Sequence, residues 1–189
     1  MENIYGKINV KIKGLSPLLM NRLNPESLKT KSRIKQKDYD EKTEARKSAY
    51  ITKVDGEEQL YIPAYAVYSM IIKTAGQYRS RRMSLSGILA GTIRIEPEEI
   101  LLGHCDYKID ERPVVIQRNR VLKWRAKIPE WQVEFTIIYN KKILTENIVN
   151  TLKTILEDGG TRMGLLDYRP QHKGWFGTFE VVQFEIEEN

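Results

Sequence analysis

The chain has 189 residues, of which 41% are hydrophobic and 30% are charged, and its formal net charge at pH 7 is +6. This length and composition suit one large globular domain and exclude a chain that is disordered throughout. The single cysteine, Cys105, excludes an internal disulfide and is typical of a reducing compartment. No signal peptide is recognisable and no apolar run is long enough to cross a bilayer, so we expect a cytoplasmic protein without membrane contacts.

The basic residues are segregated along the chain. Residues 73–94 hold five basic residues and residues 112–127 hold six, and neither segment contains an acidic residue. Acidic residues gather elsewhere, in residues 96–99 and near the C-terminus. This distribution predicts a positive face on a nearly balanced molecule, which favours an anionic partner such as nucleic acid. The alternative is that these cations only decorate a solvated surface.

The N-terminal quarter of the sequence predicts a strand, a long polar segment and a hairpin. Apolar residues alternate with lysine and asparagine over residues 8–12, which is typical of a half-buried strand. Residues 21–49 carry many charges of both signs and few apolar side chains, so we expect a mobile charged loop, with helix formers at 40–47. A short hairpin over residues 50–62 is expected around the turn pair Asp55-Gly56.

The next segments predict a helix, a basic loop and two short strands. Pro63 is suited to begin a helix and Gly76 to end it, with apolar residues at helical spacing between them. Residues 77–86 are polar and basic, which indicates a loop. Residues 91–102 predict two short strands with a break at Pro97.

The C-terminal half predicts a basic hairpin, two longer strands and the best helix of the chain. Residues 114–122 are expected to form the hairpin, and residues 131–139 alternate as a strand. An apolar stripe predicts a helix over residues 145–158, which Gly159-Gly160 is expected to terminate. The last strand, residues 178–187, alternates with one slip in its pattern.

This order of elements predicts an α+β fold. Collapsed to its core it is β-α-β-β-α-β, which is typical of a ferredoxin-like (RRM-like) arrangement with one sheet backed by two helices. We expect a single domain over residues 1–189, with the charged loop at 21–49 and a basic β-hairpin insertion over about residues 98–130.

Motifs for metal and nucleophile chemistry are weak. His104 and His172 are far apart in sequence, and Cys105 has no second cysteine with which to hold zinc. No phosphate-binding loop, dinucleotide fingerprint or nucleophile elbow is present. Asp38 and Asp40 could bind a metal ion or assist phosphodiester cleavage, but solvated surface charges are the simpler interpretation. We therefore expect no cofactor and no enzymatic activity.

Three segments together favour the binding of single-stranded nucleic acid. In residues 112–127 cations alternate with aliphatic residues and Trp124, so one hairpin face can offer both phosphate contacts and a stacking surface. Residues 77–82 form a cationic segment, and residues 159–177 combine cations and aromatic residues with glycines. For Trp131 a place in the core is the favoured alternative. The candidate contact side chains are Arg79, Arg81, Arg82, Arg118, Arg120, Lys123, Trp124, Arg125, Arg162, Tyr168, Arg169, Lys173 and Trp175.

Short motifs at both ends of the chain resemble those of the RAMP superfamily, the repeat-associated proteins of CRISPR effector complexes. They are INVKIKGLSPLLM at residues 8–20, Leu60-Tyr61-Ile62-Pro63 before the first helix, and G-x3-G followed by K-G-W-F-G-T-F-E-V at residues 160–181. The likeness is greatest for the backbone subunits that polymerise along a guide RNA, and small RAMP-like proteins of phage and prophage genomes are also similar. Residues 83–130 are not matched.

The resemblance implies roles for several segments. Residues 112–127 would form a protruding thumb, and residues 21–49 would be the segment that carries an RNA-cleaving aspartate in some members. Neither Asp38 nor Asp40 aligns securely with that aspartate, and the segment lacks the histidine of the processing nucleases. The glycine-rich loop of the family would be formed by Gly160, Gly164, Gly174 and Gly177.

Our first hypothesis is therefore a non-catalytic subunit that binds single-stranded RNA or DNA. Its partners would be the strand, further copies of itself along the strand, and other effector subunits. One alternative is a metal-dependent endoribonuclease that uses Asp38 or Asp40, or that uses His172 as a general acid or base. The other is a viral structural or assembly protein that uses the same fold for protein contacts.

Overall fold

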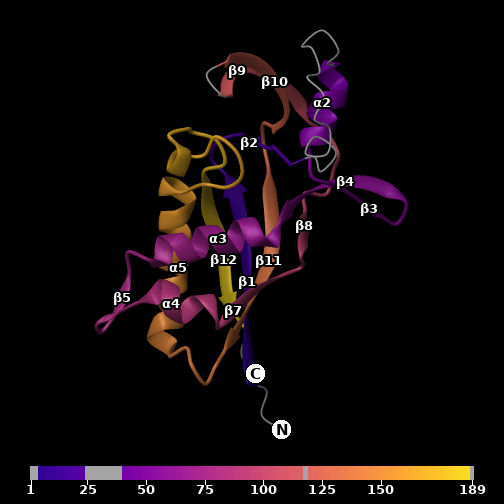
Figure 1. The fold of residues 1–189 in the computed structure, drawn as a ribbon. Helices are drawn as coiled ribbons and strands as arrows, with labels where there is room; N and C mark the ends of the chain where they lie inside the picture. The colour runs from indigo at the N-terminus through magenta and orange to yellow at the C-terminus, as the bar shows by residue number, and fades with distance from the viewer. Residues whose placement is uncertain (1–3, 24–39, 117–118, 188–189) are drawn as a thin grey trace.

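A four-stranded antiparallel sheet forms the centre of the molecule (Figure 1), in a computed structural model that describes residues 4–23, 40–116 and 119–187. The strand order is β12-β1-β11-β7. The two central strands, β1 (Tyr5–Gly14) and β11 (Gln132–Asn140), pair over nine residues, from Tyr5 opposite Asn140 to Lys13 opposite Gln132. The flanking strands are β12 (Phe179–Ile186) and β7 (Ile93–Glu96).

Two helices, α3 (Ala64–Ala75) and α5 (Glu146–Arg162), lie across the same face of this sheet (Figure 1). Each helix connects two of the four strands, so the central elements follow one another as β1, α3, β7, β11, α5 and β12. The predicted α+β class is confirmed, and the strands of this sheet are antiparallel.

Hydrophobic burial between the helices and the sheet forms the core. The alternation predicted in β1 is observed, since Ile8, Val10 and Ile12 are at most 2% exposed while Asn9 and Lys11 between them are not buried. Each fully buried aliphatic side chain contributes roughly 1.5–3 kcal/mol relative to an exposed one. The helices contribute the buried side chains Val67, Met70, Ile71, Thr74, Ile148, Leu152, Ile155 and Leu156.

The slip predicted in the last strand is a bulge. The register between β1 and β12 shifts between Lys11 and Ile12, because Lys11 pairs with Gln183 and Ile12 pairs with Val181. One extra residue, Val182, therefore lies on β12 and is 55% exposed.

Two three-stranded sheets accompany the central sheet, β2-β10-β9 and β3-β4-β8. The expected hairpin around Asp55-Gly56 is present, and one of its strands also pairs with a third strand. The basic hairpin is longer than predicted and pairs at its base with a two-residue strand. The bounds of these strands are β2 (Leu18–Leu19), β3 (Ile51–Val54), β4 (Glu57–Pro63), β8 (Glu99–Leu101), β9 (Lys108–Ile116) and β10 (Asn119–Ile128).

Two polar segments are more ordered than predicted. Residues 77–86, expected as a loop, form the paired strands β5 (Arg79–Ser80) and β6 (Met83–Ser84) and begin α4 (Leu85–Ala90). In the expected mobile loop, the helix formers at 40–47 do form helix α2 (Glu41–Ser48), because Asp40 caps it and its buried Ala45 and Ser48 lie against β10. The rest of that loop, residues 24–39, lies outside the described residues. Within the described residues, no helix is long and apolar enough to span a membrane.

The prediction that Gly159-Gly160 ends the long helix was wrong. Helix α5 continues to Arg162. Both glycines lie within the helix, where they allow it to pack closely against α3 and β12. A Cβ atom at Gly160 would lie 2.4 Å from the carbonyl oxygen of Phe179, and one at Gly159 would lie 2.1 Å from Sδ of Met70. The helix thus passes directly over β12, and Gly160 is a core residue rather than part of a loop.

We expect Gly160→Ala to destabilise the protein. An alanine in a helix gains up to about 1 kcal/mol over glycine, but overpacking against a strand backbone costs about 1–3 kcal/mol, so the loss dominates. The matched control is Gly87→Ala in α4, where an added Cβ meets nothing within 4 Å and stability should hold or rise. Urea denaturation of both variants measures the difference, and a Gly160→Ala variant as stable as the control would contradict this packing.

Candidate nucleic-acid interface

The basic hairpin and the glycine-rich loop lie together at one end of the molecule (Figure 1). The hairpin consists of β9 and β10, and the loop runs from residue 163 to residue 178, between α5 and β12. Two of the three segments that the sequence singled out therefore form one surface, which we call the hairpin–loop surface.

A buried arginine connects the two parts of this surface. Arg125 in β10 is 4% exposed, and its Nη1 donates to Oδ2 of Asp167 in the loop at 2.7 Å. Its Nη2 lies 3.6 Å from Asp110, directly across the hairpin, close enough for attraction but too far for a good hydrogen bond. A guanidinium removed from water needs such carboxylates, so this pairing fixes the hairpin over the loop.

Two predicted contact residues are therefore structural. Arg125 is engaged with carboxylates and is not available to a phosphate. Trp124 is 9% exposed, so its ring offers no stacking surface. The buried Nε1 of Trp124, and Nε and Nη2 of Arg125, have no hydrogen-bond partner among the described residues. The sequence suggested contact roles because the alternation of cations and apolar residues does not reveal which hairpin face is covered.

Arg112 forms a second contact between hairpin and loop, and the sequence-based list of contact residues did not include it. Its guanidinium lies 4.8 Å from the ring centre of Phe176, 5.5 Å from that of Tyr168 and 5.9 Å from that of Trp175. Such cation–π contacts stabilise by roughly 0.5–2 kcal/mol. The Nε of Arg112 also donates to Asp110 at 2.9 Å, so one carboxylate orients both arginines.

The loop backbone is tightly folded. A Cβ at Gly174 would lie 1.7 Å from the carbonyl oxygen of Tyr168, and one at Gly177, whose φ is +69°, would lie 2.0 Å from the carbonyl oxygen of Leu165. Tyr168 and Lys173 also have positive φ angles, of 50° and 61°. Conformations of this kind cost about 1–3 kcal/mol each and persist where the surroundings hold them, often at functional sites.

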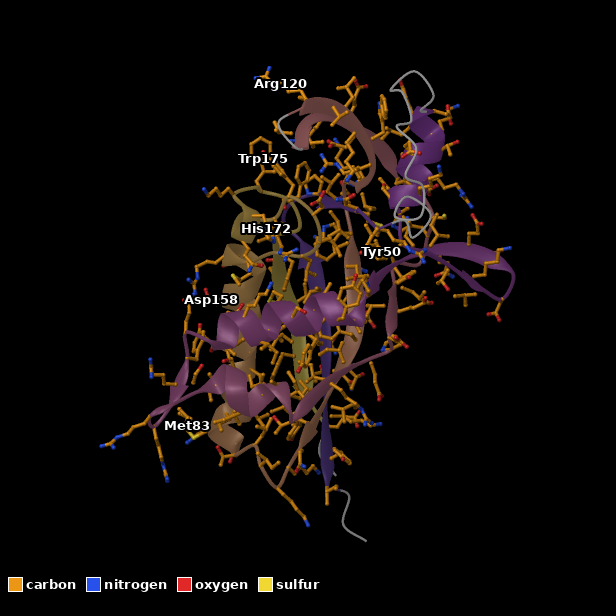
Figure 2. All side chains as sticks on the ribbon, viewed as in Figure 1. Tyr50, Met83, Arg120, Asp158, His172 and Trp175 are labelled. Carbon is orange, nitrogen blue, oxygen red and sulfur yellow. The ribbon has the colours of Figure 1, made fainter. Side chains whose placement is uncertain are left out.

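Several predicted contact side chains are exposed on the hairpin–loop surface. Trp175 is 64% exposed and Tyr168 is 40% exposed. Figure 2 shows Trp175 just below Arg120, and both Arg120 and Lys173 are exposed cations. Lys123 is half-buried, and its burial lowers the pKa of its ammonium group. The surface thus combines stacking faces with cations, the two elements of a site for single strands.

Arg162 and Arg169 are held by intramolecular contacts. Arg162 at the end of α5 forms an ion pair with Asp158, whose pKa is lowered mainly by this hydrogen bonding, and its Nη2 donates to Gln77 at 2.7 Å. Arg169 donates to the carbonyl of Leu166 and to the side chain of Gln171. Gly164 lies in the loop with a φ of +68°, close to Arg169.

The third basic segment does not join this surface. The β5–β6 hairpin that carries Arg79, Arg81 and Arg82 projects at the lower left of Figure 1, and Met83 marks it in Figure 2, far from Arg120. The three arginine side chains have no ion pair within the described part of the chain. Arg118, the remaining predicted contact, lies outside the described residues.

The residues considered for catalysis have ordinary structural environments where they are described. The carboxylate of Asp40 caps α2 by accepting from the backbone N–H and hydroxyl of Thr43, and these bonds lower its pKa. His172 is an exposed residue of the short helix η2 (Pro170–His172). Asp38 lies outside the described residues. Over residues 4–23, 40–116 and 119–187, no group of three or more His, Cys, Asp or Glu side chains is placed to hold a metal ion. Trp131 is a core residue, as expected, at 5% exposure.

Comparisons with known proteins identify a fold relative. No protein-family model matches the sequence, and no curated protein matches it. The structure is similar to a chain in the cryo-EM structure of the type III-B Cmr-β complex bound to cognate target RNA, with a TM-score of 0.59 and 12% sequence identity. The match covers 97% of this chain but 61% of that chain. At this identity the likeness shows the fold alone.

We expect Asp167→Ala to lower the stability of the protein by about 1–3 kcal/mol, the cost of leaving a buried donor of Arg125 without its partly exposed acceptor. The reason is that Arg125 would keep its charge in the interior with only Asp110 beside it, at 3.6 Å. The control is Glu134→Ala, which removes an exposed partner of Lys11 and should cost less than about 1 kcal/mol. Equal losses for the two variants in urea denaturation would refute the role of Arg125 as the connection.

Proposed function

We propose that this protein is a non-catalytic subunit that binds single-stranded nucleic acid, RNA in the first place, on the hairpin–loop surface. The observation that carries the proposal is the position of Trp175, Tyr168 and Arg120 on two segments that the ion pair of the buried Arg125 joins. Stacking on an exposed aromatic ring contributes about 1–3 kcal/mol per base and tolerates any base, while cations follow the phosphates. Little base specificity is expected from such contacts.

The core belongs, in this proposal, to the ferredoxin-like group with a β-α-β-β-α-β order. The chain order of the central elements and the strand order β12-β1-β11-β7 support this assignment. The hairpin–loop surface then lies at the end of the sheet rather than on its open face. On that open face, Lys11 is paired with Glu134 and Asn9 with Thr136, so these polar side chains already have partners.

Further copies of the chain and other effector subunits are the proposed protein partners. The support is the fold relative, which was determined within an RNA-bound type III-B Cmr complex. Copies placed side by side along one strand would each offer a hairpin–loop surface. The proposal assigns no catalytic role to Asp40, whose two hydrogen bonds from Thr43 are those of a helix cap.

We expect Trp175→Ala to weaken binding of a short single-stranded RNA by about tenfold or more, because the exposed ring would no longer stack on a base. Fluorescence anisotropy with a labelled RNA measures the dissociation constant. The matched control is Ile143→Ala, which removes a similarly exposed apolar side chain beyond β11, at the other end of the sheet. RNA that binds both variants as tightly as the unaltered protein would exclude Trp175 from the site.

Replacing the exposed cations should change the salt dependence of binding. Each phosphate contact to a single strand contributes a slope of about −0.7 in a plot of log affinity against log salt concentration. We therefore expect Arg120→Gln and Lys173→Gln each to make this slope less steep by about 0.7. Lys153→Gln, on the exposed side of α5, should leave the slope unchanged. If the slope changes only when Arg79, Arg81 or Arg82 of the β5–β6 hairpin is replaced, the RNA binds at that hairpin and not on the hairpin–loop surface.

A further inference from the structure

A separate cavity of about 280 Å³ lies between helix α3 and the glycine-rich loop. One wall is formed by α3, from Tyr65 to Lys73, and the opposite wall by loop residues from Gly164 to Gln171. In Figure 2, Tyr50 is labelled at one side of this region, above α3, and His172 at the other. The volume is just below the roughly 300 Å³ at which small-ligand pockets begin, so it suits one compact ligand.

Aromatic and amide groups line one part of the cavity. The hydroxyl groups of Tyr50 and Tyr65 lie 3.1 Å apart, and Tyr65 is 62% exposed, so its ring is open to a stacking partner. Burial raises the pKa of Tyr50, which keeps its hydroxyl neutral and able to donate. The side chains of Asn21 and Ser69 add further donors and acceptors to the lining. Flat rings beside amide and hydroxyl groups are suited to a planar heterocycle with polar edges.

The charge of the cavity favours an anion. Arg169 is half-buried, and its partners are neutral oxygens, the carbonyl of Leu166 and Oε1 of Gln171. These contacts use three of its five N–H donors and none of them neutralises its charge. Its burial lowers the pKa of Arg169 without removing the charge. Lys73 adds an exposed ammonium group at the rim.

The one carboxylate in the lining does not cancel this charge. Asp167 already accepts from Nη1 of Arg125 at 2.7 Å, on its side toward the hairpin. The cations of Arg169 and Lys73 therefore remain available to an anionic group in the cavity.

We infer that this cavity binds a single nucleotide, with its base beside the tyrosines and its phosphate at Arg169 and Lys73. The nucleotide can be one that leaves the stack of a bound strand or a free mononucleotide. The inference rests on the proposed function only for the first of these two sources. Loop residues 163–178 contribute both to the cavity and to the hairpin–loop surface, so a strand on that surface has a nucleotide within reach of the cavity.

Calorimetric titration with AMP tests the inference, with the unaltered protein, Ser69→Trp, Lys73→Glu and the control Lys153→Glu. Ser69→Trp fills the cavity from α3, and Lys73→Glu reverses an exposed charge that forms no ion pair within the described residues. We expect AMP to bind the unaltered protein and the Lys153→Glu variant with the same affinity. Each of the two cavity variants should bind AMP at least about tenfold more weakly. Adenosine should bind more weakly than AMP, because it lacks the phosphate.

A parallel titration with single-stranded RNA separates the two sources. Weaker RNA binding by Ser69→Trp and Lys73→Glu, with competition from AMP, assigns the cavity to a nucleotide of the strand. If both variants lose AMP binding but bind RNA as the unaltered protein does, the cavity is a site for a free mononucleotide. Failure of the unaltered protein to bind AMP, together with RNA binding that neither variant changes, would overturn the inference. RNA binding lost in Trp175→Ala would still support the proposed function in that case.

Discussion

Arg125 is a buried cationic side chain beneath the hairpin–loop surface. The two parts of this surface, the β9–β10 hairpin and residues 163–178, come from separate segments of the sequence. The partners of Arg125 are Asp110 across the hairpin and Asp167 in the glycine-rich loop, 42 residues further along the chain. Removing a guanidinium from water is costly unless carboxylates accept its hydrogen bonds, so the hairpin has one favourable position over the loop. Buried ionic groups add little net stability, but here they select one arrangement among many that apolar packing alone would allow.

The consequences of this pairing extend to the surface above it. Because Arg125 fixes the base of the hairpin, Arg112 lies over the rings of Tyr168, Trp175 and Phe176 and leaves Trp175 open to solvent on its outer side. The same loop, held by Asp167, forms one wall of the cavity against α3. The proposed RNA contacts and the proposed nucleotide site thus share the same short segment, whose positive φ angles leave it few alternative conformations.

The sequence predicted the regular elements well and the site only in part. Alternation in β1 and the helical stripe of α3 depend on burial on one face, which periodicity reveals directly. The glycines at 159 and 160 misled the prediction, because a glycine that ends a helix and a glycine that lets a helix approach a strand are identical in sequence. The sequence predicts Trp124 and Arg125 as nucleic-acid contacts for a similar reason, because alternation does not show which face of the hairpin is covered. The register that places Asp110 opposite Arg125 is a property of the folded hairpin and cannot be read from that alternation.

The most direct test of the hairpin–loop surface as the binding site is a map of ultraviolet cross-links between the protein and a single-stranded RNA, read by mass spectrometry of the cross-linked peptides. The account predicts cross-links in the loop, at Tyr168 and Trp175 above all, and in β10 near Arg120, with a yield that falls as salt is raised. Cross-links confined to the β5–β6 hairpin or to the open face of the sheet would contradict it.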